Sequence, residues 1–444
     1  MTAQSHAPQR KQLAIIAAAA AIAIPGIALR LSGSHDVSSA VAALLFGLAV
    51  VSAAFMLAWA AEAIQLDISA GLALALLALI AVLPEYAVDF VFTNKAGKDF
   101  AKYKSCIAPN QVEEATNHCH LALANMTGGN QLLVGVGWSM VVLLAVSRAK
   151  TLKRRGVDLS NEHDVNEHEV TLDRSHAIDI SFLILAAVYG LTLPLRSSLS
   201  LIDAVVLVSI FVAYLIRIAG APAEEPHLVG PALLIGNLAK RNRRITVAVM
   251  FLVAAGIILL VAEHFAEALV ETGTEFGISE FLLVKWLAPL ASEAPELLVA
   301  GLFAWRLNAN SALGALISSK VNQWTLLVGT LPIVFAIASK SLHGLPLDSL
   351  QRSELFVTAA QSVFAVAIVA DRHMSKREAQ GLLGLFIVQF VMQGVLKGDV
   401  EEISRVVVGA LYLAGAAAII VRKRAYVRPL LTDGLRVPHD ELHA

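Results

Sequence analysis

The chain has 444 residues, of which 57% are hydrophobic and 16% are charged, and its mean hydropathy is +0.69. An average soluble domain carries about 25% charged residues. The composition therefore excludes a soluble enzyme, a disordered protein and a secreted disulfide scaffold. The 34 basic and 35 acidic residues nearly cancel, which argues against a nucleic-acid partner. The sequence predicts an all-α polytopic membrane protein whose main partner is the lipid bilayer.

Apolar stretches long enough to cross a bilayer, which takes roughly 20 helical residues, occur about twelve times. In chain order they are 12–32, 38–65, 68–94, 119–147, 177–194, 199–219, 243–270, 277–305, 311–338, 354–371, 378–396 and 403–421. None alternates apolar and polar residues as a membrane barrel would. The first stretch also has features of a signal peptide. A retained helix is favoured because Arg30 stands where a cleavage site would be needed.

Twelve spans would put both termini on the same side of the membrane. Lys and Arg residues gather in the segments that are cytoplasmic if both termini are, including Lys153, Arg154 and Arg155. The exception is segment 95–118, which is rich in lysine but would lie outside. The rule works best for short loops, so this long segment weighs less. We therefore expect a multi-pass protein of the inner or plasma membrane with cytoplasmic termini.

Both cysteines, Cys106 and Cys119, lie in or beside segment 95–118. A disulfide would close a short loop if this segment faces an oxidising space. Two unpaired thiols agree with the sequence at least as well.

The two halves of the chain resemble each other. Leu83-Pro84-Glu85 in the third stretch matches Ala294-Pro295-Glu296 in the eighth, and each is followed by a helix that opens with small and polar residues. Each copy has five helices, an odd number, so the second copy enters the membrane inverted, and in such folds the binding site lies near the midplane between the repeats. The expected organisation is a tail with an extra helix (1–37), a first repeat (38–220), a cytoplasmic linker (221–242), a second repeat (243–397) and an extra helix with a basic tail (398–444).

The repeated Pro-Glu pair predicts a cation site. Proline frees the backbone carbonyl four residues before it, and the adjacent glutamate adds a charge at the same depth. Asp89 lies one turn after Glu85, and Glu293 lies one turn before Glu296, so each pair shares a helix face. Four carboxylates within a membrane are costly and indicate a function. Oxygen ligands of this kind suit hard cations such as Ca²⁺ and Na⁺.

These motifs resemble the sodium/calcium exchanger superfamily of cation/Ca²⁺ antiporters, which includes bacterial Na⁺(Ca²⁺)/H⁺ exchangers. The resemblance covers about 38–397. It implies that Glu85 and Glu296 are the central cation-binding carboxylates and that Asn125 and Asn130 are further ligands. It also places Ser292 on the threonine of the family motif and Ser319 on its serine. With the two neighbouring acids, the candidate metal-ion ligands are Glu85, Glu296, Asn125, Asn130, Asp89, Ser292, Glu293 and Ser319.

Lys320 departs from the family pattern. It falls where the second motif has an asparagine, opposite Asn130, although a shift of two residues would instead pair Asn322 with Asn130. An ammonium at this depth is costly unless it is paired, and a carboxylate at about 4 Å would gain roughly 4 kcal/mol at an effective dielectric constant of ~20. Lys320 is therefore a candidate built-in cation that modulates the charge of the site and favours proton coupling. The alternative is a lysine that reaches the membrane surface or a water-filled vestibule.

The sequence thus predicts a secondary active antiporter that exchanges Ca²⁺ or Na⁺ for H⁺ (or Na⁺) by alternating access. It predicts no cofactor besides the transported ions. Two rival hypotheses are a transport-inactive exchanger-fold scaffold or sensor, and an intramembrane enzyme that uses the acids in catalysis. The extra helices at 12–32 and 403–421 could either pack on the core or form the contact of a homodimer.

Overall fold

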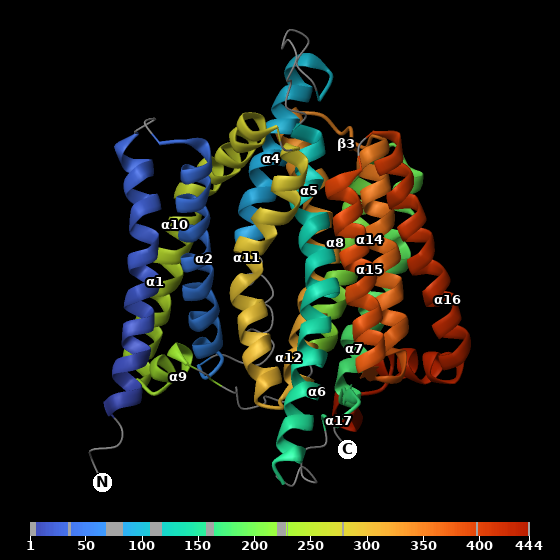
Figure 1. Ribbon diagram of the computed structural model, residues 1–444. Coiled ribbons are helices and arrows are strands. Elements are labelled where there is room, and N and C mark those ends of the chain that lie inside the picture. The colour runs from blue at the N-terminus through green and yellow to red at the C-terminus, as the bar shows by residue number, and fades with distance from the viewer. Residues whose placement is uncertain are drawn as a thin grey trace. The chain divides into compact units, whose positions relative to one another are not determined.

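The computed structural model describes residues 6–33, 37–67, 83–106, 118–156, 164–219, 228, 230–277, 279–396 and 398–442, and most of these residues are helical (Figure 1). Within them, ten helical segments are long and apolar enough to span a membrane, and α11 (Glu280–Trp305) adds an eleventh if its two parts form one span. These segments correspond to eleven predicted stretches. The remaining one, 68–94, falls mostly on residues outside this description. The polytopic all-α prediction is confirmed, and the total of twelve spans stays a prediction.

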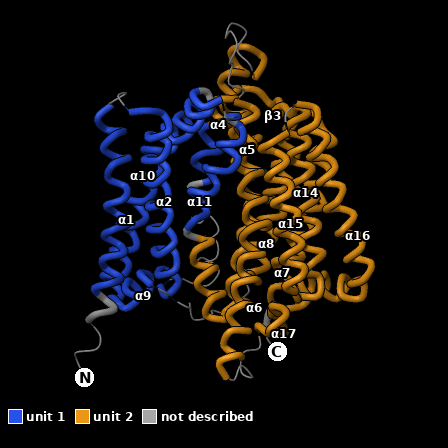
Figure 2. The backbone as a smooth tube through the Cα atoms, in the orientation of Figure 1, with its two compact units in different colours: residues 1–91, 219–295 blue, residues 92–218, 296–444 orange. Residues whose placement is uncertain are grey.

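The chain divides into two compact units (Figure 2). Unit 1 contains residues 1–91 and 219–295, and unit 2 contains residues 92–218 and 296–444. The divisions pass through α4 (Leu83–Tyr103) and α11. Each unit draws on both predicted repeats, and the limits of those repeats stay a prediction.

Unit 1 is a helical bundle. Besides its parts of α4 and α11, it contains α1 (His6–Ser32), α2 (Ser39–Ile64), α9 (Pro231–Gly236) and α10 (Lys240–Phe276). A Cβ atom on Gly26 would lie 2.6 Å from the carbonyl oxygen of Leu45, so glycine permits the close approach of α1 to α2. The Ser52 hydroxyl also donates a hydrogen bond to the Ala19 carbonyl. The predicted first extra helix therefore packs against α2.

An ion pair joins the segment after α2 to the start of α10. The Arg243 guanidinium donates two hydrogen bonds to the Asp67 carboxylate, at 2.6 Å and 2.9 Å. These bonds hold the pKa of Asp67 below its usual value.

Unit 2 holds the remaining elements. Its first half contains α5 (His118–Leu132), η1 (Leu133–Trp138), α6 (Ser139–Arg154), β1 (Glu169–Thr171), η2 (Arg174–His176), α7 (Ala177–Gly190), η3 (Leu193–Leu195), β2 (Ser198–Leu199) and α8 (Leu201–Ile218). Its second half contains α12 (Ala309–Asn322), η4 (Gln323–Leu327), α13 (Val328–Ser339), β3 (Leu345–Pro346), α14 (Ser349–Ile368), η5 (Val369–Asp371), β4 (His373–Ser375), α15 (Lys376–Val395), α16 (Asp399–Leu435) and α17 (His439–Leu442).

Two short antiparallel ladders relate the halves of unit 2. The strand before α7, β1, pairs with β4, the strand after α14, in the register Val170 to Met374. The strand after α7, β2, pairs with β3, the strand before α14, in the register Leu199 to Leu345. The strand before α7 thus pairs with the strand after α14, and the strand after α7 pairs with the strand before α14. This exchange is what two inverted copies of one motif would produce, and it supports the predicted repeat.

A buried carboxylate shapes the turn into α8. Asp203 accepts hydrogen bonds from the Tyr189 hydroxyl and from the backbone and side chain of Ser200, each at 2.7 Å, and it also contacts Arg196. Asp203 therefore holds the β2–α8 connection together.

Candidate cation site

Four of the predicted ligands lie on the parts of α4 and α11 that belong to unit 1. Glu85, Asp89, Ser292 and Glu293 are all at most 4% exposed. The Ser292 hydroxyl donates to the carbonyls of Ala288 and Pro289 at 3.2 Å. These bonds use its hydrogen and not the lone pairs of its oxygen. Unit 1 thus contains three buried carboxyl groups on two helices.

The asparagine ligands lie on α5 in unit 2, where Asn125 and Asn130 are at most 1% exposed. The Asn130 side-chain amide donates to the Met126 carbonyl at 2.9 Å, one turn back along the helix. Its Oδ1 atom accepts no hydrogen bond from the residues that the structure describes. A buried amide oxygen without a donor is costly, and it is also a suitable ligand for a hard cation.

The second half of unit 2 brings two further candidates together. Glu296 begins the unit 2 part of α11, and its Oε2 atom accepts a hydrogen bond of 3.1 Å from the hydroxyl of Ser319 on α12. Ser319 is 8% exposed and Glu296 is half-buried. A hydrogen bond to a charged group both stabilises the carboxylate and fixes its orientation.

Lys320, the next residue of α12, is completely buried. Its ammonium donates a hydrogen bond of 2.9 Å to the backbone carbonyl of Asn130 and lies 5.4 Å from the centre of the Trp324 ring. The side chain therefore points towards α5 and does not reach the surface. Two hydrogen bonds within unit 2, from Lys320 to Asn130 and from Ser319 to Glu296, thus start from consecutive residues of α12.

Two π-helical segments identify Asn130 and Lys320 as equivalent positions. The segment η1 begins at Leu133, the third residue after Asn130, and η4 begins at Gln323, the third residue after Lys320. Single π-helical turns occur frequently at functional sites. Their matching positions favour the alignment of Lys320 with Asn130 over the shifted alignment with Asn322.

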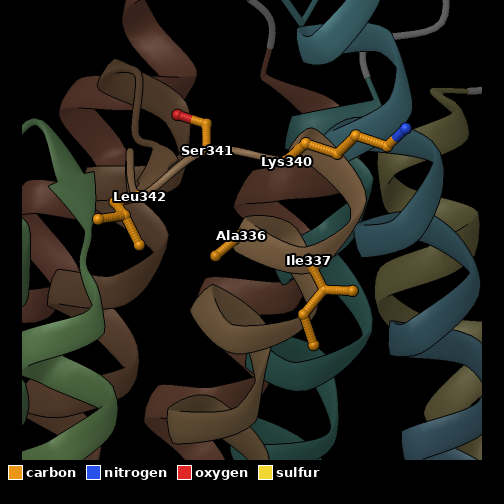
Figure 3. A pocket seen from close by; sticks show the side chains of 5 residues that line it. All are labelled: Ala336, Ile337, Lys340, Ser341 and Leu342. Atoms are coloured by element: carbon orange, nitrogen blue, oxygen red, sulfur yellow. The ribbon is translucent and has the colours of Figure 1, made fainter.

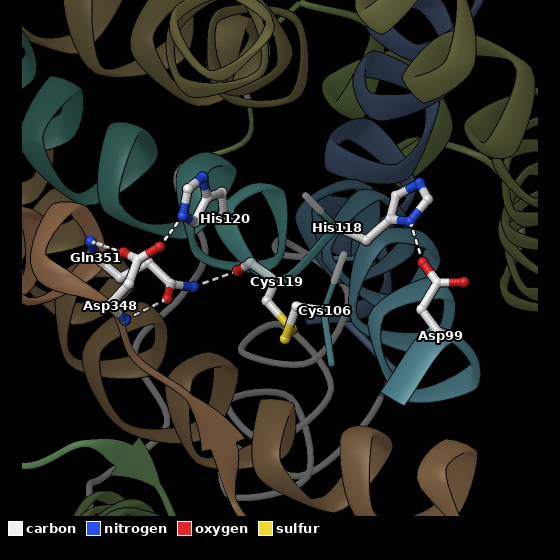
Figure 4. The surroundings of a disulfide bond; sticks show 7 residues. All are labelled: Asp99, Cys106, His118, Cys119, His120, Asp348 and Gln351. Atoms are coloured by element: carbon white, nitrogen blue, oxygen red, sulfur yellow. Dashed lines mark hydrogen bonds and ion pairs between the residues drawn. A yellow bond between two sulfur atoms is a disulfide. The ribbon is translucent and has the colours of Figure 1, made fainter. Parts of the chain in front are cut away.

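The first turn of α5 is held in place at three consecutive residues (Figure 4). His118 contacts Asp99 of α4 at 2.6 Å, and Cys119 forms a disulfide with Cys106. His120 contacts Asp348, the residue that caps α14, and Gln351 donates to the Cys119 carbonyl. Of the two alternatives for the cysteines, the structure has the disulfide. These contacts fix the start of the helix that carries both asparagines.

A surface pocket lies elsewhere, at the end of α13. It is lined by Ala336, Ile337, Lys340, Ser341 and Leu342 (Figure 3). None of the candidate ligands lines it. No cluster of three His, Cys, Asp or Glu side chains arranged as a metal centre occurs in the described part of the chain.

Sequence reasoning missed two buried groups. Glu354 and Arg405 are 1% and 3% exposed and form a hydrogen-bonded ion pair of 2.7 Å between α14 and α16. Glu354 is the first and Arg405 the third residue of its predicted span, where charged groups are expected to reach water. Their opposite charges, on the tenth and twelfth predicted stretches, were the available signal, and this signal alone does not show that the two groups pair. Lys285 is also completely buried, with its ammonium 4.8 Å from the centre of the Trp286 ring.

Comparisons with known proteins show the family and the fold of the chain. The model of the family "Sodium/calcium exchanger protein" matches residues 38–219 and 246–395. The crystal structure of an H⁺/Ca²⁺ exchanger, CAX, is 39% identical, covers 96% of this chain and 98% of its own, and has a TM-score of 0.83. A structure of native YfkE is 14% identical, covers 85% of this chain and 100% of its own with a TM-score of 0.60, and thus shows the fold alone. A search of curated protein sequences finds no significant match.

Proposed function

Because the chain belongs to the sodium/calcium exchanger protein family, we propose that it exchanges Ca²⁺ or Na⁺ for H⁺ by alternating access. It is a multi-pass membrane transporter of the cation antiporter class and not an enzyme. The similar CAX structure is described as an H⁺/Ca²⁺ exchanger, which supports Ca²⁺ and H⁺ as the exchanged ions. We further propose an inner or plasma membrane location with cytoplasmic termini.

The proposed cation ligands are the oxygen-bearing side chains that the sequence predicts, led by the carboxylates of Glu85 and Glu296. Asp89 and Glu293 add negative charge, and Asn125, Asn130, Ser292 and Ser319 add neutral oxygens. The buried Oδ1 of Asn130 and the hydrogen bond between Ser319 and Glu296 support this assignment. No cofactor beyond the transported ions is required.

The buried ammonium of Lys320 is the observation that carries the choice of H⁺ over Na⁺. This ammonium donates a hydrogen bond to the Asn130 carbonyl. At the position of Lys320 itself, the aligned family motif has a neutral asparagine. A fixed positive charge at this position fills one cation subsite permanently and repels a further metal ion. The site then holds fewer transported cations at once, which disfavours exchange of several Na⁺ ions for each Ca²⁺.

A proton can replace the transported cation at a buried carboxylate. A carboxylate out of contact with water is costly while it carries an uncompensated charge, so it binds either a metal ion or a proton. Release of the metal ion on one side is therefore coupled to proton uptake. This exclusion of one ion by the other is the basis of antiport.

Ion flux in sealed proteoliposomes tests the proposal. We expect an imposed pH gradient to drive Ca²⁺ or Na⁺ movement, and Glu296→Gln to abolish it without loss of folded protein. Glu167→Gln is the matched control, because Glu167 forms an exposed ion pair with Lys153 outside the spans. Flux driven only by a Na⁺ gradient would overturn proton coupling. An absence of flux in well-folded wild-type protein would favour the scaffold or sensor hypothesis.

A further inference from the structure

A buried polar network lies in unit 2 and connects α16 to the end of α5. Its centre is the side chain of Gln131, the residue that follows Asn130. The Gln131 amide nitrogen donates to Thr358 Oγ1 at 2.6 Å and to Glu354 Oε2 at 3.3 Å, both on α14. Gln389 of α15 donates to the Gln131 amide oxygen at 2.6 Å. Gln131 is thus held from two neighbouring helices and is completely buried.

Glu354 is the charged member of this network. Buried within α14, it could not remain ionised without a partner. Arg405 of α16 supplies that partner through a hydrogen bond of 2.7 Å from its Nε atom, and it also contacts Glu401 one turn back on α16. Gln393 of α15 donates to the same carboxylate at 3.4 Å.

The packing of α16 permits this contact. A Cβ atom on Gly409 would lie 2.4 Å from the Phe356 ring, and one on Gly415 would lie 2.7 Å from the Phe364 ring. Glycine at these positions lets α16 approach α14 closely and brings Arg405 to the depth of Glu354. The helix itself lies beyond the stretch that the family model matches, which ends at residue 395.

We infer that Arg405 is a positioning residue for the cation site. It acts through Glu354 and Gln131 on Asn130, the residue whose carbonyl accepts the Lys320 hydrogen bond. Arg405 neutralises Glu354, so that the carboxylate can stay buried and accept a hydrogen bond from Gln131. The fixed Gln131 side chain then sets the position of the last turn of α5. This inference rests on the proposed transport function.

The structure offers a matched control on the same helix. Lys423 of α16 makes ion pairs with Asp371 at 2.8 Å and with Glu378 at 3.0 Å. These contacts also hold α16 against η5 and α15 but do not involve Gln131. Removing Lys423 therefore loosens α16 without disturbing the network.

The experiment compares cation-concentration curves of pH-driven flux for wild type, Arg405→Met, Glu354→Gln/Arg405→Met and Lys423→Met, with folded protein quantified by size-exclusion chromatography. We expect Arg405→Met to raise KM at least fivefold while Vmax changes less than twofold. The double variant, which removes both charges but keeps polar groups beside Gln131, should return KM to within twofold of wild type. Lys423→Met should lower thermal stability and leave KM within twofold.

Three results would overturn the inference: an unchanged KM in Arg405→Met, no recovery in the double variant, or the same KM increase in Lys423→Met. An absence of flux in wild-type protein would instead contradict the proposed function, so the two failures are distinguishable.

Discussion

The Lys320 ammonium lies 2.9 Å from the backbone carbonyl of Asn130, so two equivalent positions of the inverted repeats meet inside unit 2. One position presents an amide and the other a fixed charge. We propose that Lys320 acts there as a permanent cation, beside a carbonyl that could otherwise help to bind a transported one.

Replacing Lys320 with asparagine tests this interpretation. Lys320→Asn restores the family residue and removes the fixed charge, so the site gains room for another monovalent cation. With Ca²⁺ as the exchanged cation, we expect its flux to become sensitive to Na⁺, with Na⁺ changing the rate at least fivefold, whereas wild-type flux changes less than twofold. Lys320→Arg, which keeps the charge, should stay insensitive to Na⁺. Equal insensitivity in the asparagine variant would contradict the role of the ammonium.

Removing the Ser319 hydroxyl should weaken cation binding without abolishing transport. A hydrogen bond to a charged group contributes about 1.5–3 kcal/mol, and Ser319 makes one to Glu296. We expect Ser319→Ala to raise KM at least tenfold, since a tenfold change corresponds to about 1.4 kcal/mol. Thr330→Ala is the control, because its hydroxyl donates a local hydrogen bond of 2.8 Å to the Leu327 carbonyl. An equal KM for both variants and wild type would remove Ser319 from the site.

The Asp67–Arg243 pair predicts a pH-dependent contribution to stability. The pKa of Asp67 is lowered in the folded protein, so its stabilisation is complete above the unfolded pKa of about 3.9 and is lost as the pH falls through the folded pKa. We expect Asp67→Asn to lower Tm at pH 7 by about 2 °C and to match wild type at strongly acidic pH. Thermal unfolding in detergent across pH measures this difference. A pH-independent difference in Tm would contradict the assigned cause.

Loss of the Cys106–Cys119 disulfide should destabilise the first turn of α5. A crosslink across a loop of this size contributes about 3 kcal/mol. We expect Cys106→Ser/Cys119→Ser to unfold at a lower temperature, and unreduced wild-type protein to expose no free thiol on denaturation. Two titratable thiols in protein prepared without reductant would show that the bond does not form.

Sequence patterns predicted the long helices well because apolar length alone specifies a membrane helix. The internal likeness of Pro84-Glu85 and Pro295-Glu296 also predicted an inverted repeat, which the paired strands around α7 and α14 support. These strands have two or three residues each and carry no detectable periodicity. The sequence could not reveal the Glu354–Arg405 pair either, because a charge at the end of an apolar stretch can reach water or turn inward. The roles of the candidate ligands stay predictions.

Proton release during cation binding tests the central claim most directly. Purified protein in weakly buffered detergent at neutral pH would be titrated separately with Ca²⁺ and Na⁺ while the solution pH is recorded. Competition for one carboxylate site predicts proton release that saturates with the transported cation and is lost in Glu296→Gln but kept in Glu167→Gln. Saturable cation binding without proton release would contradict proton-coupled exchange at this site.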